Sequence, residues 1–193
     1  MGRPDAAKSA FTEAECKAVD DWVDGGGSLL LITDHPPFGS AADLLARRFG
    51  VDMSKGVTVD RMNRSERGLL FARENHLLGD HPITNGRDES ERVNRVLTFT
   101  GQSLKGPPGT IAFLNFADTA VDKSEAKDVS AAGRAQGIAL PHGKGRVVVL
   151  GEAAQLSAQV IGFPPSPMGM NVPGCDNRQM ALNIMHWLSG LTE

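Results

Sequence analysis

The chain has 193 residues, of which 40% are hydrophobic and 22% are charged, and its 20 basic and 23 acidic residues give a net charge of −3. This composition argues against a disordered tail and a charge-driven nucleic-acid binder. No apolar run approaches the roughly 20 residues that cross a bilayer, and residues 1–10 lack the apolar stretch of a signal peptide. We therefore expect one domain with a substantial core, no nucleic-acid or membrane partner, and the cytoplasm as the default compartment.

The first predicted elements are a helix and a buried strand. Thr12 and Glu15 have the spacing of a capping box, and the glycines at 25–27 end the helix. Residues 28–33 (SLLLIT) contain four consecutive aliphatic side chains. Such a run indicates a strand buried on both faces, which is typical of a parallel sheet.

The rest of the chain predicts a second helix, further strands, two surface loops and a last helix. The run RVVVL at 146–150 is the second strand expected to be buried on both faces, and it pairs with 137–140 as a hairpin. This order of elements predicts a single α/β domain over 1–193, with 1–10 as a flexible N-terminus. The remaining expectations are helices over 40–50, from 151 to about 160 and from Asp176 onward, strands over 93–100 and 111–116, and surface loops over 118–134 and 162–175.

Polar residues follow the two strands that are expected to be buried on both faces. Asp34 and His35 come directly after the first, and Glu152 comes after the second. Ligands of parallel sheets bind beyond the carboxyl ends of the strands, so these three residues are the candidate catalytic groups. His81 lies in a second Asp-His-Pro sequence. The four residues together are candidate ligands of a divalent metal of the zinc or manganese type.

Each of these candidates also has a structural interpretation. An Asp in a Pro-containing turn often accepts hydrogen bonds from backbone N–H groups, and a His beside it can fill a polar niche. Glu152 would interact favourably with the dipole of the helix expected after it.

Other polar residues are weaker candidates. Gln102 and Ser103 follow the 93–100 strand, and Asn171 and Asp176 lie in the last loop and at the start of the last helix. These four are candidate substrate-binding residues, although Asp176 is more simply a helix N-cap. The Gly-Lys pair at 143–144 joins strand to strand, with no helix N-terminus to hold a phosphate. We therefore expect no nucleotide cofactor.

Six blocks of sequence resemble an uncharacterised bacterial family. The blocks are AFTEAE, WVDGGGSLLLITDHPPFG, GDHPIT, RVLTFTGQSL, GKGRVVVLGEAA and CDNRQMALNIMHWLSG, and they cover nearly the whole chain. That family belongs to the class I glutamine-amidotransferase-like superfamily, alongside ThuA-like domains and the GIFT domain of intraflagellar transport proteins. The resemblance implies an α/β fold, a flavodoxin-like three-layer sandwich with helices on both faces of a mainly parallel sheet.

The chain departs from this superfamily in two ways. Enzymes of the superfamily place a nucleophilic Cys in a tight turn between a strand and a helix, but neither Cys16 nor Cys175 follows a predicted buried strand. Thiolate-dependent glutamine hydrolysis is therefore not expected. The resemblance also implies an N-terminally truncated fold, because such folds normally have a β-α-β unit before the helix that starts here at Thr12. The strand over 29–32 would then have an open apolar edge, which predicts a homodimer or higher homo-oligomer through that edge.

Two classes of function follow from these candidates. The leading prediction is a hydrolase for an ester or phosphoester bond of a small-molecule substrate. Its water would be activated by a divalent metal or by a His/carboxylate pair. The alternative is a non-catalytic module of amidotransferase-like fold that binds a carbohydrate or a protein, or that serves assembly through the open edge.

Overall fold

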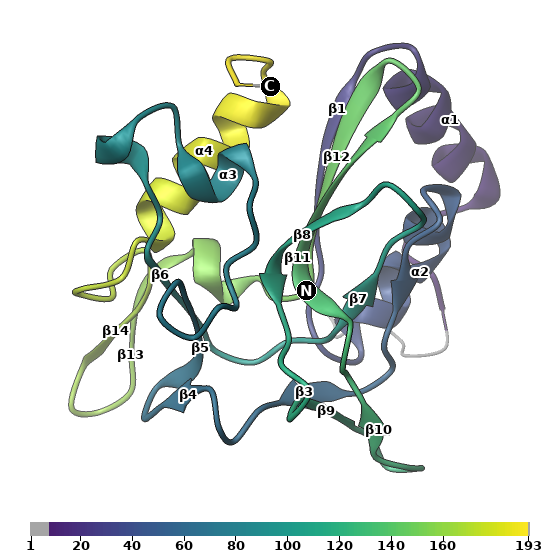
Figure 1. Cartoon of the computed structure of the whole chain (residues 1–193). Coiled ribbons are helices and arrows are strands. Elements are labelled where there is room, and N and C mark those ends of the chain that lie inside the picture. The colour runs from purple at the N-terminus through teal and green to yellow at the C-terminus, as the bar shows by residue number, and fades with distance from the viewer. Residues whose placement is uncertain (1–7, 193) are drawn as a thin grey trace.

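The computed structural model describes residues 8–192, in which four helices and fourteen strands surround two hydrophobic cores (Figure 1). The helices are α1 (Glu13–Asp24), α2 (Phe38–Arg48), α3 (Pro82–Asn85) and α4 (Asn177–Leu188), with 3-10 turns η1 (Glu89–Glu91) and η2 (Ala154–Leu156). The first seven strands are β1 (Ser28–Ile32), β2 (Asp52–Met53), β3 (Val57–Val59), β4 (Arg64–Ser65), β5 (Gly68–Ala72), β6 (Arg95–Thr98) and β7 (Leu104–Lys105). The others are β8 (Ile111–Asn115), β9 (Val121–Lys123), β10 (Val129–Ser130), β11 (Ala135–His142), β12 (Gly145–Leu150), β13 (Ala158–Ile161) and β14 (Ser166–Gly169).

The central sheet is mixed, and most of its pairs are antiparallel. Its six strands run in the order β1-β12-β11-β7-β2, with β8 also paired to β11, and β1–β12 is its parallel pair. The three smaller sheets, β10-β9-β3, β4-β5-β6 and β13-β14, are antiparallel throughout. The prediction of a flavodoxin-like sandwich with a mainly parallel sheet is therefore wrong. Short connections such as the β11–β12 turn join antiparallel neighbours, whereas parallel neighbours require long crossovers.

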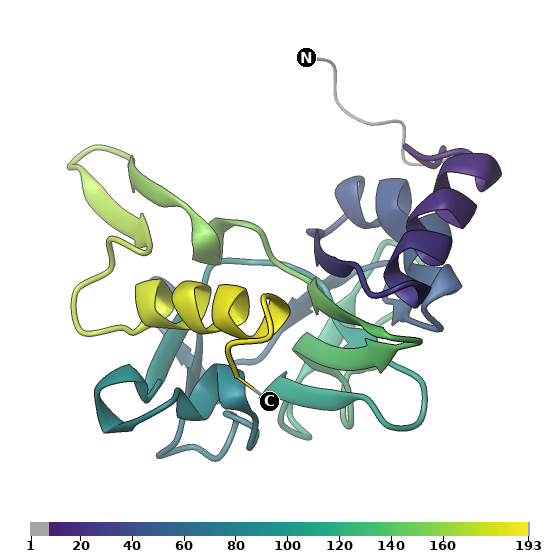
Figure 2. The same ribbon diagram turned by 90° about the horizontal axis from the view of Figure 1, so that it is seen from above.

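Strand β12 is buried on both faces, as its sequence predicts. Val147 and Val149 belong to the core under α1 and α2, whereas Val148 and Leu150 belong to the core under α4. All four side chains are fully buried. Figure 2 shows α4 on one side of β12 and the α1–α2 pair on the other. Helices cover both faces locally, although the sheet as a whole is not parallel.

The first and last helices confirm their sequence signals. The Thr12 side chain accepts a hydrogen bond from the backbone N–H of Glu15, whose carboxylate accepts one from the backbone N–H of Thr12, so the capping box forms. Helix α4 begins at Asn177, after Asp176. Helix α2 begins at Phe38 and not at Ser40.

Three predicted segments differ from the structure. The helix expected over 151–160 is only the turn η2 followed by β13, where the β-branched pair Val160–Ile161 favours a strand. The segment 118–134 contains β9 and β10, and 162–175 contains β14. Within the expected N-terminal arm, residues 1–7 lie outside the described range. Across 8–192, no helix is long and apolar enough to cross a membrane.

Candidate functional site

Two carboxylates meet where β1 and β12 end. Asp34 Oδ2 accepts a hydrogen bond of 3.2 Å from the N–H of Ala153, and its Oδ1 accepts one of 2.7 Å from the N–H of His35. Glu152 Oε1 and Oε2 accept hydrogen bonds of 2.8 and 2.7 Å from the N–H groups of Ala154 and Gln155. The sequence prediction that these two residues lie close together is thus confirmed: Glu152 accepts the first two N–H groups of η2, and Asp34 accepts the N–H of Ala153 just before it.

The Glu152 carboxyl is fully buried, and its electrostatics are unusual. Burial raises its pKa to about 7, and the nearby Asp34 charge acts in the same direction. Backbone N–H donors, including that of Phe99, oppose this rise because they favour the charged form. The result is a carboxyl group that changes its protonation near neutral pH but has no surface open to a substrate.

His35 lies beside Asp34 at the rim of this cluster. Its Nδ1 is 2.8 Å from the carbonyl oxygen of Pro36, and its Nε2 is 3.8 Å from Asp34 Oδ1. The ring also meets Phe38 edge-on, with centroids 6.3 Å apart. About a third of the side chain is exposed (35%), so His35 is the member of the trio that a solute can approach most readily.

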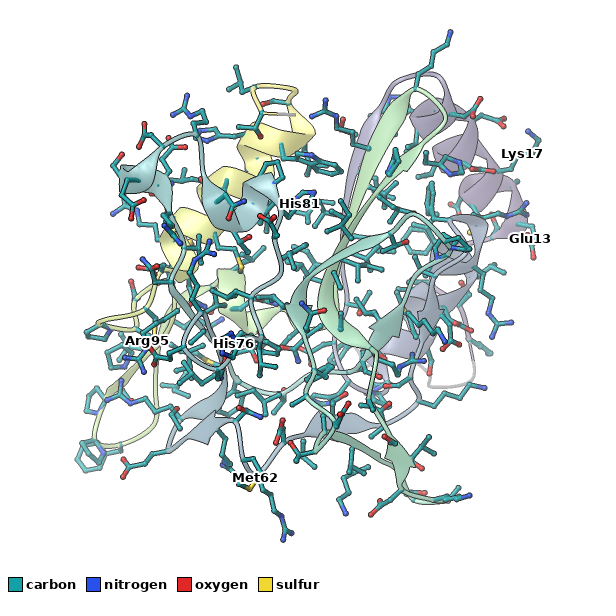
Figure 3. The ribbon with its side chains drawn as sticks, viewed as in Figure 1. Glu13, Lys17, Met62, His76, His81 and Arg95 are labelled. Carbon is teal, nitrogen blue, oxygen red and sulfur yellow. The ribbon has the colours of Figure 1, made fainter. Side chains whose placement is uncertain are left out.

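His81 lies elsewhere. Its Nδ1 accepts the N–H of Ile83 at the start of α3, and its ring contacts the Trp187 ring at 5.1 Å. The Trp187 carbonyl accepts a hydrogen bond from Arg146, near the start of β12, whereas Glu152 follows the end of that strand. Figure 3 labels His81 next to α3. The side chain is buried, and burial lowers its pKa to about 4, so it is a neutral core residue.

The predicted metal ligand set is therefore not assembled. Asp34, His35 and Glu152 are neighbours, but His81 is at the other end of β12. Across residues 8–192, no group of three or more His, Cys, Asp or Glu side chains is placed to hold a metal ion. The metal-binding interpretation is corrected accordingly, because a repeated Asp-His-Pro sequence does not determine where its two copies lie in space.

Gln102 and Ser103 are fully buried and serve the packing of the sheet. Gln102 Nε2 donates a 2.7 Å hydrogen bond to Thr33 Oγ1. Ser103 Oγ donates one of 2.6 Å to Asp122 and accepts one of the same length from Arg134 Nε. Both residues follow β6 as predicted, but neither side chain reaches a surface where it could contact a substrate.

Asn171 and Asp176 hold loops together. Asn171 Nδ2 lies 3.3 Å from the carbonyl oxygen of Gln159, the residue opposite Met168 in the β13–β14 hairpin. Asp176 Oδ2 accepts the N–H groups of Asn94 and Arg95 at 2.7 and 3.0 Å. Asp176 therefore links the start of α4 to β6 and does not cap its own helix through its side chain.

The sequence prediction missed a buried polar network between β3, β9 and the start of β7. Asp122 is buried, and it accepts hydrogen bonds from Thr58 Oγ1 and Ser103 Oγ. Arg134 adds an ion pair to Asp52, with 2.7 Å between Nη1 and Oδ2. The partners are far apart in the chain, so no short sequence motif predicts the network.

Strand β1 forms one edge of the central sheet, as predicted. The Thr33 N–H bonds to the carbonyl of Leu150, and the Arg146 N–H bonds to the carbonyl of Gly27. Because bonding direction alternates along a strand, Leu30 and Ile32 direct their N–H and C=O groups away from β12. Among residues 8–192, no strand pairs with this outer side.

An apolar groove of about 380 Å³ accompanies the open edge of β1. Ile32 and Phe38 are two of its walls and are 41% and 45% exposed. Asp34 and Ala153 also line the groove, which therefore adjoins the strand-end carboxylates. The other walls include Phe11, Leu31, Ala41 and Ala42.

Comparisons with known proteins show a fold and no family. No protein-family model matches the chain, and no curated protein matches it. A solved structure described as the "mmIFT52 N-terminal domain" is similar, with a TM-score of 0.64 and 14% identity, over 93% of this chain and 72% of that chain. At that identity the likeness shows the fold alone. The resemblance to the glutamine-amidotransferase-like superfamily stays a prediction.

Proposed function

We propose that the chain is a non-catalytic assembly module that pairs with a second copy of itself through the outer edge of β1. The observation that carries the proposal is an unpaired edge strand beside an apolar groove, with Ile32 and Phe38 exposed in its walls. An open edge of this kind is a template for another strand. Strand addition satisfies the outward N–H and C=O groups and buries the apolar walls.

The composition of β1 favours a second copy as the added strand. Residues Ser28–Ile32 (SLLLI) contain no charged residue or proline of the kind that blocks edge pairing. Across a two-fold axis, two copies of β1 pair antiparallel, and the axis passes beside Leu30. Ser28 of one copy then lies opposite Ile32 of the other, so the outward groups of Leu30 and Ile32 find equivalent partners.

Replacing Ile32 tests this pairing directly. Ile32→Pro removes an N–H that points to the open edge and leaves the β1–β12 ladder intact, so we expect dimers to become monomers in light scattering at micromolar concentration. Ile32→Val is the matched control, because it keeps the N–H and a β-branched side chain, and it stays dimeric. Ile32→Lys, which places a charge on the edge, also gives monomers. A wild-type chain that is monomeric in the same measurement contradicts the proposal.

Hydrolysis of an ester or phosphoester bond is the second candidate. It is favoured by the partly exposed His35 ring, whose Nε2 lies 3.8 Å from Asp34 Oδ1, because a His/carboxylate pair can act in general acid/base catalysis. The test is turnover of p-nitrophenyl acetate and p-nitrophenyl phosphate by the wild type and by His35→Ala. Activity that His35→Ala abolishes, with an unchanged circular dichroism spectrum, supports a hydrolase. Absence of turnover in the wild type contradicts it for these substrates.

A further inference from the structure

Two adjoining pockets lie against the three-stranded sheet β4-β5-β6. Residues of the β13–β14 hairpin line the first, and the segment 172–175 that follows the hairpin lines the second. The first has a volume of about 220 Å³, and the second has a volume of about 380 Å³. Arg67, Leu97 and Val172 line both, so the two spaces share a wall. Neither pocket includes Asp34, His35 or the edge of β1, and they form a separate candidate site.

The two pockets differ in chemical character. The first is mainly apolar, and its volume is below the roughly 300 Å³ at which pockets for drug-sized molecules begin. The second is lined by two arginines, Arg67 and Arg95, and by no Asp or Glu. The apolar walls of the first are Leu97, Phe99, Ile161, Pro167, Met168 and Val172.

No carboxylate lines the second pocket beside its two arginines. The Arg67 guanidinium makes no hydrogen bond or ion pair with any residue in 8–192, and Arg95 pairs only with exposed Glu74, at 3.2 Å. Asp176 is close but does not line the pocket, and its Oδ2 accepts hydrogen bonds from backbone N–H groups. Glu66 lines the first pocket and not the second. The lining of the second pocket therefore carries a net positive charge.

We propose that these pockets together bind one small amphiphilic carboxylate. Its apolar body fills the first pocket against Leu97 and Ile161, and its carboxylate lies in the second pocket against Arg67 and Arg95. Arginine suits this role because its planar N–H groups match the two oxygens of a carboxylate. A cation is disfavoured by the two positive charges, and a neutral apolar molecule gains no charge-assisted hydrogen bond from the arginines.

A matched pair of probes tests the proposal. Binding of 3-phenylpropionate and of its neutral amide, 3-phenylpropanamide, is measured by calorimetry on the full chain at low salt. We expect the carboxylate to bind about tenfold more tightly or better, since a charge-assisted hydrogen bond is worth about twice a neutral one. Equal affinities for the two probes overturn the role of the arginines, and no saturable binding of the carboxylate at millimolar concentration overturns the site.

Two pairs of variants locate the bound probe. Arg67→Gln removes the advantage of the carboxylate over the amide, whereas Arg64→Gln, on the same hairpin but outside both pockets, keeps it at the same net charge. Ile161→Asp abolishes binding because it places a charge on the apolar wall. Val160→Asp, the exposed neighbour outside the pocket, leaves binding unchanged. Binding that depends equally on both members of either pair places the probe elsewhere and overturns the assignment.

Discussion

The buried carboxyl of Glu152 makes the stability of this protein depend on pH in a direction opposite to that of most carboxylates. Burial raises the pKa of Glu152 in the folded state to about 7, from a reference value of 4.5. The protonated form is therefore favoured by folding. Its contribution is fully present below pH 4.5 and is lost as the pH rises through 7.

The size of this effect follows from the shift. Each pKa unit corresponds to about 1.4 kcal/mol, so the contribution of Glu152 is on the order of 3 kcal/mol. Carboxylates whose pKa is lowered by folding stabilise the protein as the pH rises, which is the opposite direction. The pH dependence of wild-type stability alone therefore does not separate their contribution from that of Glu152. Glu152→Gln removes the titrating group, so the difference between the two proteins isolates it. The substitution also perturbs a hydrogen bond to the N–H of Ala154 or Gln155, but that offset does not vary with pH.

Urea unfolding of the wild type and Glu152→Gln from pH 5 to pH 8.5 provides the measurement. We expect the free energy of unfolding of the wild type, relative to the variant, to fall by roughly 2 to 3 kcal/mol over this range. Glu125→Gln, on an exposed loop, is the control and changes the profile little. A difference between wild type and Glu152→Gln that stays constant from pH 5 to pH 8.5 refutes the reasoning.

Three further predictions concern residues with structural roles. His81 is neutral in the fold because burial lowers its pKa from 6.5 to about 4. The stability that this neutral form contributes is fully present above pH 6.5 and is lost as the pH falls to 4. Urea unfolding of the wild type relative to His81→Asn should therefore show a free energy of unfolding that falls by about 3 kcal/mol over this range. Asp122→Ala removes the buried carboxylate near Arg134, and we expect it to lower the free energy of unfolding in urea by about 3 kcal/mol. An unchanged free energy of unfolding contradicts a stabilising role of this network. Thr12→Ala breaks the capping box with Glu15 and costs about 1 kcal/mol in thermal unfolding, and an unchanged melting temperature contradicts that role.

The sequence predicts the helices and strands of this fold better than it predicts whether paired strands run parallel or antiparallel. Burial on both faces marks β12 correctly, because such a run of aliphatic residues has no solvent-facing positions. The same signal predicts a parallel sheet, but a mixed sheet covered by helices on both sides produces it too. The sequence also predicts the hairpin over 137–150, whose antiparallel pairing already conflicts with a mainly parallel sheet.

The strand-end residues show how far sequence order determines a site. Asp34 and Glu152 meet because β1 and β12 are parallel neighbours, so their ends coincide. Nothing comparable connects His81 to them, and the partner of Ser103 is Asp122, nineteen residues away on another sheet. Such long-range pairs depend on the packing of whole sheets.

The roles of the strand-end carboxylates also depend on the backbone around them. Both oxygens of Glu152 bind the N–H groups that begin η2, and Asp34 binds the N–H of Ala153 immediately before it. A chain that turns sharply after a buried strand leaves these donors without backbone partners, and an acidic side chain supplies the acceptors. Hydrogen bonding to the backbone is therefore enough to account for polar residues after a buried strand, without a catalytic role. No comparable structural role accounts for the open edge of β1, which is the stronger sign of function in this protein.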